Sequence, residues 1–361
     1  MSVKSAEEHL WDACSEGRLD LVETLLKSHP DLDVNSAGLD RGDTPLHRAC
    51  RFGWTHVVQH LLQHPRIRVN EPNAGRGTPF YIACQEGNLQ AVKVLLKDQR
   101  IDVNAARADD ATPFFVACEK GYVEITKLLL EDPRVECNRT KKNDVTPFLI
   151  ACFRGWHDVV ALLLADDRVN ISWGDHQGCT PLWFASQNGH LSIVRLMLAS
   201  GRDVNHRARS ASGDNEWSDT TAADMARRNK DLEQEEDEEE AEFQQRHHDC
   251  QVIADLLDSF EADELGTRTK LREVPGIREP FIAESFALVV LLSDDFLRLR
   301  PPASSSSPTA VNCVRFLVIA QALPMELQMA LSNRVFRSRK DLVLTKHSEP
   351  AFRKLSRFFV N

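Results

Sequence analysis

The chain has 361 residues, of which 42% are apolar and 27% are charged, and this ordinary composition excludes general disorder. Its formal net charge of −10 argues against a nucleic-acid partner, because a general nucleic-acid binder needs a basic surface to displace counterions. No basic and then apolar leader is visible, and the longest apolar run, Phe286–Leu292, is far shorter than the roughly 20 residues of a membrane span. We therefore expect no membrane partner and a location in the cytoplasm or the nucleus. The nine cysteines are then expected to be reduced thiols.

A repeat dominates the first part of the chain. Thr-Pro pairs recur every 34 residues, and a glycine and a pair of large apolar residues follow each pair at the same spacing. The threonines are Thr44, Thr78, Thr112, Thr146 and Thr180, and the glycines are Gly53, Gly87, Gly121, Gly155 and Gly189. A fixed period between about 20 and 50 residues is typical of a solenoid, in which each unit buries its apolar face against its neighbours.

The unit that begins at Thr78 illustrates the local structure that this pattern predicts. Threonine is a good helix N-cap, and Pro79 suits the first helical position because its missing N–H would have no partner there. The segment PFYIACQE then predicts a short helix, which Gly87 ends. The next segment, NLQAVKVLLKD, has apolar residues at helical spacing along one face. An extended stretch, RIDVN, and a polar connector lead to the following Thr-Pro.

The segment TPLHRACRFG, from Thr44, is similar to the ankyrin signature T-P-L-H-x-A. The pairs Val69–Asn70, Val103–Asn104 and Val204–Asn205 resemble the V-N that closes an ankyrin repeat, and His9–Asn35 resembles an N-terminal capping repeat. The resemblance implies an all-α ankyrin-repeat solenoid of helix–turn–helix units with hairpin-like connectors. Six units are expected in residues 1–206, each one residue longer than the usual repeat, with the extra residue after the second helix.

Several residue types recur once per unit and need a structural explanation before a functional one. The cysteines Cys14, Cys50, Cys84, Cys118 and Cys152 each follow an alanine, and neighbouring repeats place them about 10 Å apart, whereas zinc ligands must lie about 2.3 Å from one ion. We predict small buried side chains and no metal site. The resemblance implies a histidine that ties the turns together, and only His47 retains it, while Trp54, Tyr122 and Trp156 are expected to wedge between helices. No catalytic motif is visible, so we predict no catalytic residue, no cofactor and no enzyme activity.

Residues 207–265 resemble a seventh repeat that is interrupted. Thr220–Arg228 is similar to a first helix and Asp249–Ser259 to a second one. Between them, Asp231–Phe243 contains nine acidic residues that repel one another. This block is interpreted either as solubilising filler or as a site that attracts a basic partner.

The 34-residue period stops in residues 266–361. Apolar and amphipathic segments there predict a small helical bundle that covers the end of the repeats, with a flexible loop at 301–310. The segment LPMELQMAL, Leu323–Leu331, resembles the start of an F-box. That resemblance implies an alternative function, in which a Skp1-like partner links the chain to a cullin-type ubiquitin ligase and the chain recognises the substrate.

The ankyrin resemblance implies that a partner protein, unidentified by the sequence, binds the concave face formed by the first helices and the connectors. We predict a non-enzymatic protein–protein interaction scaffold. Its candidate contact residues precede each turn glycine, and they are Arg51, Phe52, Gln85, Glu86, Glu119, Lys120, Phe153, Arg154, Gln187 and Asn188. Aromatic and arginine side chains among them are typical of binding hot spots.

Overall fold

The computed structural model describes residues 5–38, 41–211, 218–230 and 240–272, together with Val274 and Ile277. All regular structure in these ranges is helical, so the predicted all-α class is confirmed. The helices are α1 (Ala6–Glu16), α2 (Leu19–Ser28), α3 (Pro45–Arg51), α4 (Thr55–Leu62), α5 (Pro79–Gln85), α6 (Leu89–Leu96), α7 (Pro113–Lys120), α8 (Val123–Glu131), the 3₁₀ turn η1 (Lys142–Asp144), α9 (Pro147–Arg154), α10 (His157–Leu164), α11 (Pro181–Gln187), α12 (Leu191–Ala199), α13 (Ala222–Lys230), α14 (Glu240–Ala262) and α15 (Glu264–Leu271).

These elements belong to two compact units. The first contains the described residues up to Ile193 and those of Asp203–Gln251. The second contains Val194–Arg202 and the described residues from Val252 onward. The division of the chain at residues 206 and 265 therefore stays a prediction.

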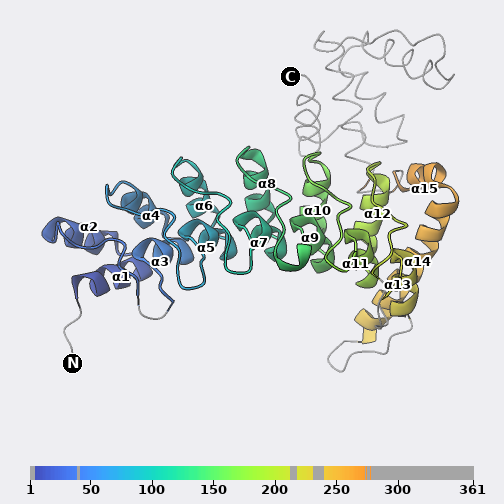
Figure 1. Cartoon of the computed structure of the whole chain (residues 1–361), viewed down its shortest axis with the longest axis horizontal. Helices are drawn as coiled ribbons and strands as arrows, with labels where there is room; N and C mark the ends of the chain where they lie inside the picture. Colours follow the sequence, from blue (N-terminus) through green and yellow to red (C-terminus); the bar gives the residue numbers. More distant parts are fainter. Residues whose placement is uncertain are drawn as a thin grey trace, which may run out of the picture. The chain divides into compact units, whose positions relative to one another are not determined.

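The first unit is a row of antiparallel helix hairpins (Figure 1). In the hairpins α3–α4, α5–α6, α7–α8 and α9–α10, a short helix that starts at Thr-Pro packs on the apolar helix that follows it. The first helices form one continuous layer, because each of α1, α3, α5, α7, α9, α11 and α13 contacts the next. The second helices α2, α4, α6, α8 and α10 form the other layer in the same way. We call the first layer the inner helices.

The predicted N-caps are present in every Thr-Pro unit. Each of the five threonine hydroxyls accepts a hydrogen bond from the backbone N–H three residues later, and the prolines occupy the first helical position. Helix α1 has no Thr-Pro, and there Ser5 and Glu8 form a reciprocal capping box instead. The sequence pattern S-x-x-E carries that signal and could have been identified in advance.

The turn glycines are required for two reasons at once. Their φ values are positive, as at Gly121 (φ +75°), and they end the inner helices in the left-handed conformation. A side chain of the next repeat also lies directly against each one. A Cβ atom on Gly121 would lie 2.6 Å from Cδ2 of Trp156, and one on Gly17 would lie 2.5 Å from Cδ2 of Trp54. The predicted wedging of these tryptophans is thus observed, and their indole N–H groups donate to backbone carbonyls of the preceding repeat.

The asparagine that closes each of the first four repeats, Asn35, Asn70, Asn104 and Asn138, joins its repeat to the next. Asn104 donates from Nδ2 to the carbonyl of Arg134 (2.7 Å) and accepts at Oδ1 from the N–H of Glu136 (3.0 Å). Asn35, Asn70 and Asn138 make the same pair of bonds in their own repeats. The side-chain amide therefore satisfies one donor and one acceptor of the next repeat's backbone.

The recurring cysteines are buried, as predicted, and the retained histidine is buried as well. All five cysteines of the inner helices are 0% exposed and free of disulfides. His47 accepts at Nδ1 from the N–H of Thr44 (3.1 Å), so its Nε2–H donates to the carbonyl of Gly77 in the next repeat (3.0 Å). At the corresponding position of the sixth repeat, Trp183 donates from Nε1 to Oγ1 of Thr220 (3.0 Å), so a different side chain provides the connection there.

In the second unit, α15 provides polar contacts to the end of α12. Arg268 and Arg272 donate to the carbonyls of Leu198 (3.1 Å) and Ala199 (2.8 Å), which would otherwise be among the unsatisfied carbonyls at a helix C-terminus.

Three predicted segments lie outside the described residues: most of the acidic block, the loop at 301–310 and the F-box-like stretch Leu323–Leu331. None of the helices in the described ranges is both long enough and apolar enough to cross a bilayer.

Candidate protein-binding surface

The ten predicted contact residues lie at corresponding places, at the C-terminal ends of α3, α5, α7, α9 and α11. Because the inner helices form one layer, these ends form a row that advances by one repeat at each step. We call this row, with the connector tips, the inner-helix surface. The structure gives its members very different surroundings.

Phe52 is a partly exposed aromatic residue that rests on an arginine. Its side chain is 47% exposed, and the guanidinium carbon of Arg48 lies 4.7 Å from its ring centroid. The same guanidinium lies 4.2 Å from the ring of Trp11 on α1, and its Nε donates to Oγ of Ser15 (2.9 Å). Arg48 is thus in contact with two aromatic rings and held by a hydrogen bond, so Phe52 has a fixed support. Neither Arg48 nor Trp11 was among the predicted contact residues, although Arg48 lies one helical turn before Phe52.

Arg51 and Glu86, both predicted contact residues, are engaged with each other. Arg51 donates from Nη1 to Oε1 of Glu86 (2.9 Å) and from Nη2 and Nε to Oδ2 of Asp43 (3.0 and 3.1 Å). Asp43 is only 1% exposed, and its other oxygen accepts from Nδ2 of Asn73 (2.8 Å). This network joins three consecutive repeats. It uses the guanidinium of Arg51 for contacts within the protein and leaves the carboxylate of Glu86 partly accessible.

The fifth and sixth repeats present a second aromatic group. Phe153 packs edge-on against Phe184 with ring centroids 5.5 Å apart, and the guanidinium of Arg154 lies 5.6 Å from the Phe153 centroid. Glu119 lies 3.9 Å from Arg154, which is a loose ion pair, and Lys120 is exposed. Phe153 is therefore less exposed than Phe52, and the exposed side chains beside it, Lys120 and Arg154, are basic.

At the last described Thr-Pro repeat, the predicted pair makes contacts within the protein. Asn188 donates from Nδ2 to the carbonyl of Phe153 (2.8 Å), and the carbonyl of Gln187 accepts from Asn229 of α13. Gln85 donates to Glu86 (3.1 Å). The structure thus brings all ten residues into one row but leaves Phe52, Glu86, Lys120 and Arg154 as its more accessible members.

The connectors are joined to one another by a ladder of backbone hydrogen bonds. Ala74 N–H donates to the carbonyl of Arg41 (3.0 Å), and the same bond recurs in the following connectors. Asp109 lies between Lys141 and Arg107, each at 3.2 Å. Burial alone would raise the pKa of Asp109, but the hydrogen bond from Lys141 and the charge of Arg107 outweigh it and lower that pKa. The connectors are therefore a fixed edge of the inner-helix surface.

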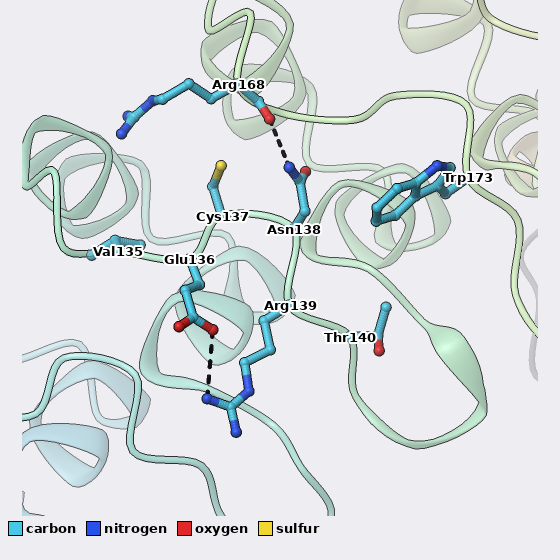
Figure 2. Close-up of a pocket in the computed structure, with 8 residues that line it drawn as sticks. All are labelled: Val135, Glu136, Cys137, Asn138, Arg139, Thr140, Arg168 and Trp173. Carbon is cyan, nitrogen blue, oxygen red and sulfur yellow. Dashed lines mark hydrogen bonds and ion pairs between the residues drawn. The ribbon is translucent and has the colours of Figure 1, made fainter.

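A shallow depression of about 570 Å³ lies between the extended segments of two neighbouring repeats (Figure 2). Its lining residues are Val135, Glu136, Cys137, Asn138, Arg139, Thr140, Arg168 and Trp173. Nδ2 of Asn138 donates a hydrogen bond to the carbonyl of Arg168, and Nη1 of Arg139 forms an ion pair with Oε2 of Glu136 (3.6 Å). These polar groups therefore have partners within the protein. Trp173 is 52% exposed at one side. The arrangement has no converging set of side chains that could hold a ligand.

Two histidines and a cysteine of the first unit have pKa values that their surroundings shift. Burial lowers the pKa of His47 and of His190, and each ring donates to a backbone carbonyl. Burial raises the pKa of Cys14 to about 12. Within the described ranges, no group of three or more His, Cys, Asp or Glu side chains could hold a metal ion.

Stacked helix hairpins with hydrogen-bonded connectors define a repeat solenoid, a class of protein whose extended surface binds other macromolecules. A family model for ankyrin repeats, in three copies, matches residues 10–107, 76–141 and 114–208, which together exceed half of the chain. The chain belongs to the ankyrin-repeat family, and the predicted resemblance is confirmed. Ankyrin repeats are in general protein–protein interaction modules.

Two solved structures show the same fold. The ankyrin repeat domain of Bcl-3, a member of the IκB protein family, is 23% identical, with a TM-score of 0.53 over 60% of this chain and 92% of that domain. The human ASB11 ankyrin repeat domain is 22% identical, with a TM-score of 0.50 over 68% of this chain and 96% of that domain. No curated protein matches the chain in sequence.

Proposed function

We propose that the chain is a non-enzymatic scaffold of the cytoplasm or nucleus that binds a partner protein on the inner-helix surface. The observation that carries this proposal is Phe52, a 47%-exposed aromatic side chain fixed on Arg48 at the end of an inner helix. Aromatic and arginine side chains are enriched in protein interfaces and among the residues that contribute most of the binding energy.

The surroundings of Phe52 favour binding energetically. Association costs about 0.5–1.5 kcal/mol for each flexible side chain that the interface immobilises. Arg48 and Arg51 are already held by Ser15 and Asp43, so little of that entropy remains to be lost. A partner that covers Phe52 therefore gains apolar burial on a surface that is ordered in advance.

Phe153 provides a second aromatic contact three repeats away. Neighbouring repeats are about 10 Å apart, so the two phenylalanines are about 30 Å apart along the row. That separation suits an extended interface better than a single small pocket. All ten contact residues fall in residues 1–206, which we propose as the binding region.

The test is affinity capture of partners by the tagged full-length chain, followed by quantitative mass spectrometry. Phe52→Ala is expected to lower the recovery of specific partners, and the double variant Phe52→Ala/Phe153→Ala is expected to abolish it. Trp173→Ala is the matched control, because it removes a similarly exposed aromatic side chain that lines the depression between two extended segments and does not lie at the end of an inner helix. Circular dichroism confirms that each variant is folded. Partner recovery that depends on Trp173 and not on Phe52 would refute the proposal.

A further inference from the structure

Helix α4, in the layer of second helices, carries a row of histidines. His56, His60 and His64 are spaced by four residues, and the first two lie within the helix. Residues four apart lie on the same face of a helix, with their Cβ atoms about 5–6 Å apart. Two histidines at this spacing can therefore both reach one metal ion, as they do in the helical H-E-x-x-H zinc motif.

The ring of His56 is held in one orientation and one tautomer. Its Nε2 lies 3.1 Å from the carbonyl oxygen of Gly17 in the first repeat, so Nε2 carries the proton and donates it. The ring also packs edge-on against Trp54, with centroids 6.3 Å apart, and Trp54 is itself anchored by its bond to the carbonyl of Ser15 (2.9 Å). The other nitrogen of His56, Nδ1, has no hydrogen bond to the described residues, so in the neutral ring its lone pair is available.

This arrangement is the usual one for a histidine that binds a metal ion. Metal-ligating histidines almost always donate their other ring N–H to a carbonyl or a carboxylate, which fixes the tautomer and makes the ligating nitrogen more basic. The carbonyl of Gly17 has that role for His56. Nδ1 of His56 is thus prepared to act as a ligand.

His60 supplies a second imidazole on the same face. Its ring is half-buried, and neither nitrogen has a hydrogen bond within the described ranges. The Cα–Cβ bonds of a helix tilt toward its N-terminus, so His60 leans toward His56. Since His56 bonds to the first repeat, this face of α4 is directed to α2, which contacts α4. Helix α2 has the carboxylates of Asp20 and Glu23, and its one base, Lys27, is paired with Glu23 (3.2 Å).

The other bases nearby lie away from this pair. Arg66 is beside His64, whose Nδ1 accepts from the N–H of Arg66 (3.3 Å). Burial, and then the charges of Arg66 and His60, lower the pKa of the His64 ring. Lys93 and Lys97 belong to α6 and its C-cap, on the side of α4 opposite to the first repeat. His64 is therefore less suited to hold a cation, and the pair that remains is His56 and His60.

We propose that Nδ1 of His56 and a ring nitrogen of His60 bind a divalent transition metal ion, with Zn²⁺ as the representative. Imidazole nitrogen is one of the preferred ligands of Zn²⁺, at about 2.0–2.1 Å. Two protein ligands leave the remaining positions to water, in keeping with the absence of a three-residue metal cluster from the described part of the chain. The site belongs to the second helices, so it is independent of binding at the inner-helix surface.

The test is long-range ¹H–¹⁵N NMR of the full-length chain labelled with ¹⁵N-histidine and titrated with ZnCl₂. The chain has 13 histidines, and the first additions of zinc should shift the ring nitrogens of His56 and His60 alone. The variants His56→Ala and His60→Ala assign these signals. In the zinc-bound form, Nε2 of His56 should stay protonated, because it still donates to the carbonyl of Gly17.

Isothermal titration calorimetry measures the affinity. His60→Ala should weaken the tightest zinc binding about tenfold or more, since the loss of a group that only orients a ligand already costs about 10–100-fold. Alanine favours helix, and circular dichroism checks that this variant is folded. His248→Ala, the matched control, removes an exposed histidine of α14 and should leave the affinity unchanged.

Three results would overturn the inference. They are zinc-induced shifts confined to other histidines, no shift of His56 and His60 at all, and tight zinc binding that survives His60→Ala. None of these bears on the proposed function, because the capture experiment depends on Phe52 and not on a metal ion.

Discussion

The turn glycines are predicted to be irreplaceable for two separable reasons, and Gly121→Ala separates them. At φ +75° an alanine would cost about 1–2 kcal/mol in the left-handed conformation. Its Cβ would also lie 2.6 Å from Cδ2 of Trp156, so the indole must move. The bond from Trp156 Nε1 to the carbonyl of Glu119 (2.9 Å) is then lost or weakened, at about 0.5–1.5 kcal/mol. We expect a total loss of about 1.5–3.5 kcal/mol in the free energy of unfolding.

The assay is equilibrium unfolding in urea followed by circular dichroism, with the slope compared between variants because repeat arrays can unfold in stages. In a Trp156→Ala background the steric term disappears. Gly121→Ala should then cost only the backbone term of about 1–2 kcal/mol. An equal loss in both backgrounds would refute the claim that the glycine is needed for the approach of the next repeat.

Two further predictions concern titratable groups. The hydrogen bond from Arg134 lowers the pKa of Asp132, so the stability that this pair contributes is complete above the unfolded-state pKa of about 3.9 and is lost as the pH falls through the folded-state pKa. Arg134→Gln should therefore lower the urea midpoint more near pH 7 than below about pH 4, where only the bond from Arg134 to the carbonyl of Leu96 is lost; an equal decrease at both pH values would contradict this. Burial raises the pKa of Cys14 to about 12 and that of Cys50 still further, so peptide mapping after alkylation should show both thiols modified only once the chain is unfolded, and their rapid labelling in the native chain would count against their burial.

The sequence predicts the repeat unit well because its signals are local. A threonine followed by proline places an N-cap, and a glycine nine residues after it ends the inner helix, as at Thr78 and Gly87. Both effects depend on the backbone of a few neighbouring residues, so they can be inferred without tertiary contacts. The Thr-Pro pattern does not predict the capping box of Ser5 and Glu8, because the first repeat has no Thr-Pro.

The character of the inner-helix surface could be predicted only in part. The position relative to the turn glycine predicts that all ten candidate contact residues lie in one row, because the 34-residue period gives each of them the same place in its repeat. It could not show that Arg51 bonds to both Asp43 and Glu86, because that network joins side chains from three repeats. Nor could it distinguish Phe52 from Phe153, which differ because Phe184 packs against the latter.

The account's central claim is that the inner-helix surface, and not the rest of the stack, contacts a partner protein. The most direct measurement places the photocrosslinker benzoylphenylalanine at position 52 or at position 173 of the full-length chain in cells. We predict a discrete crosslinked protein species from position 52 and none from position 173. Crosslinking from position 173 alone, or from neither position while capture recovers a partner, would contradict the account.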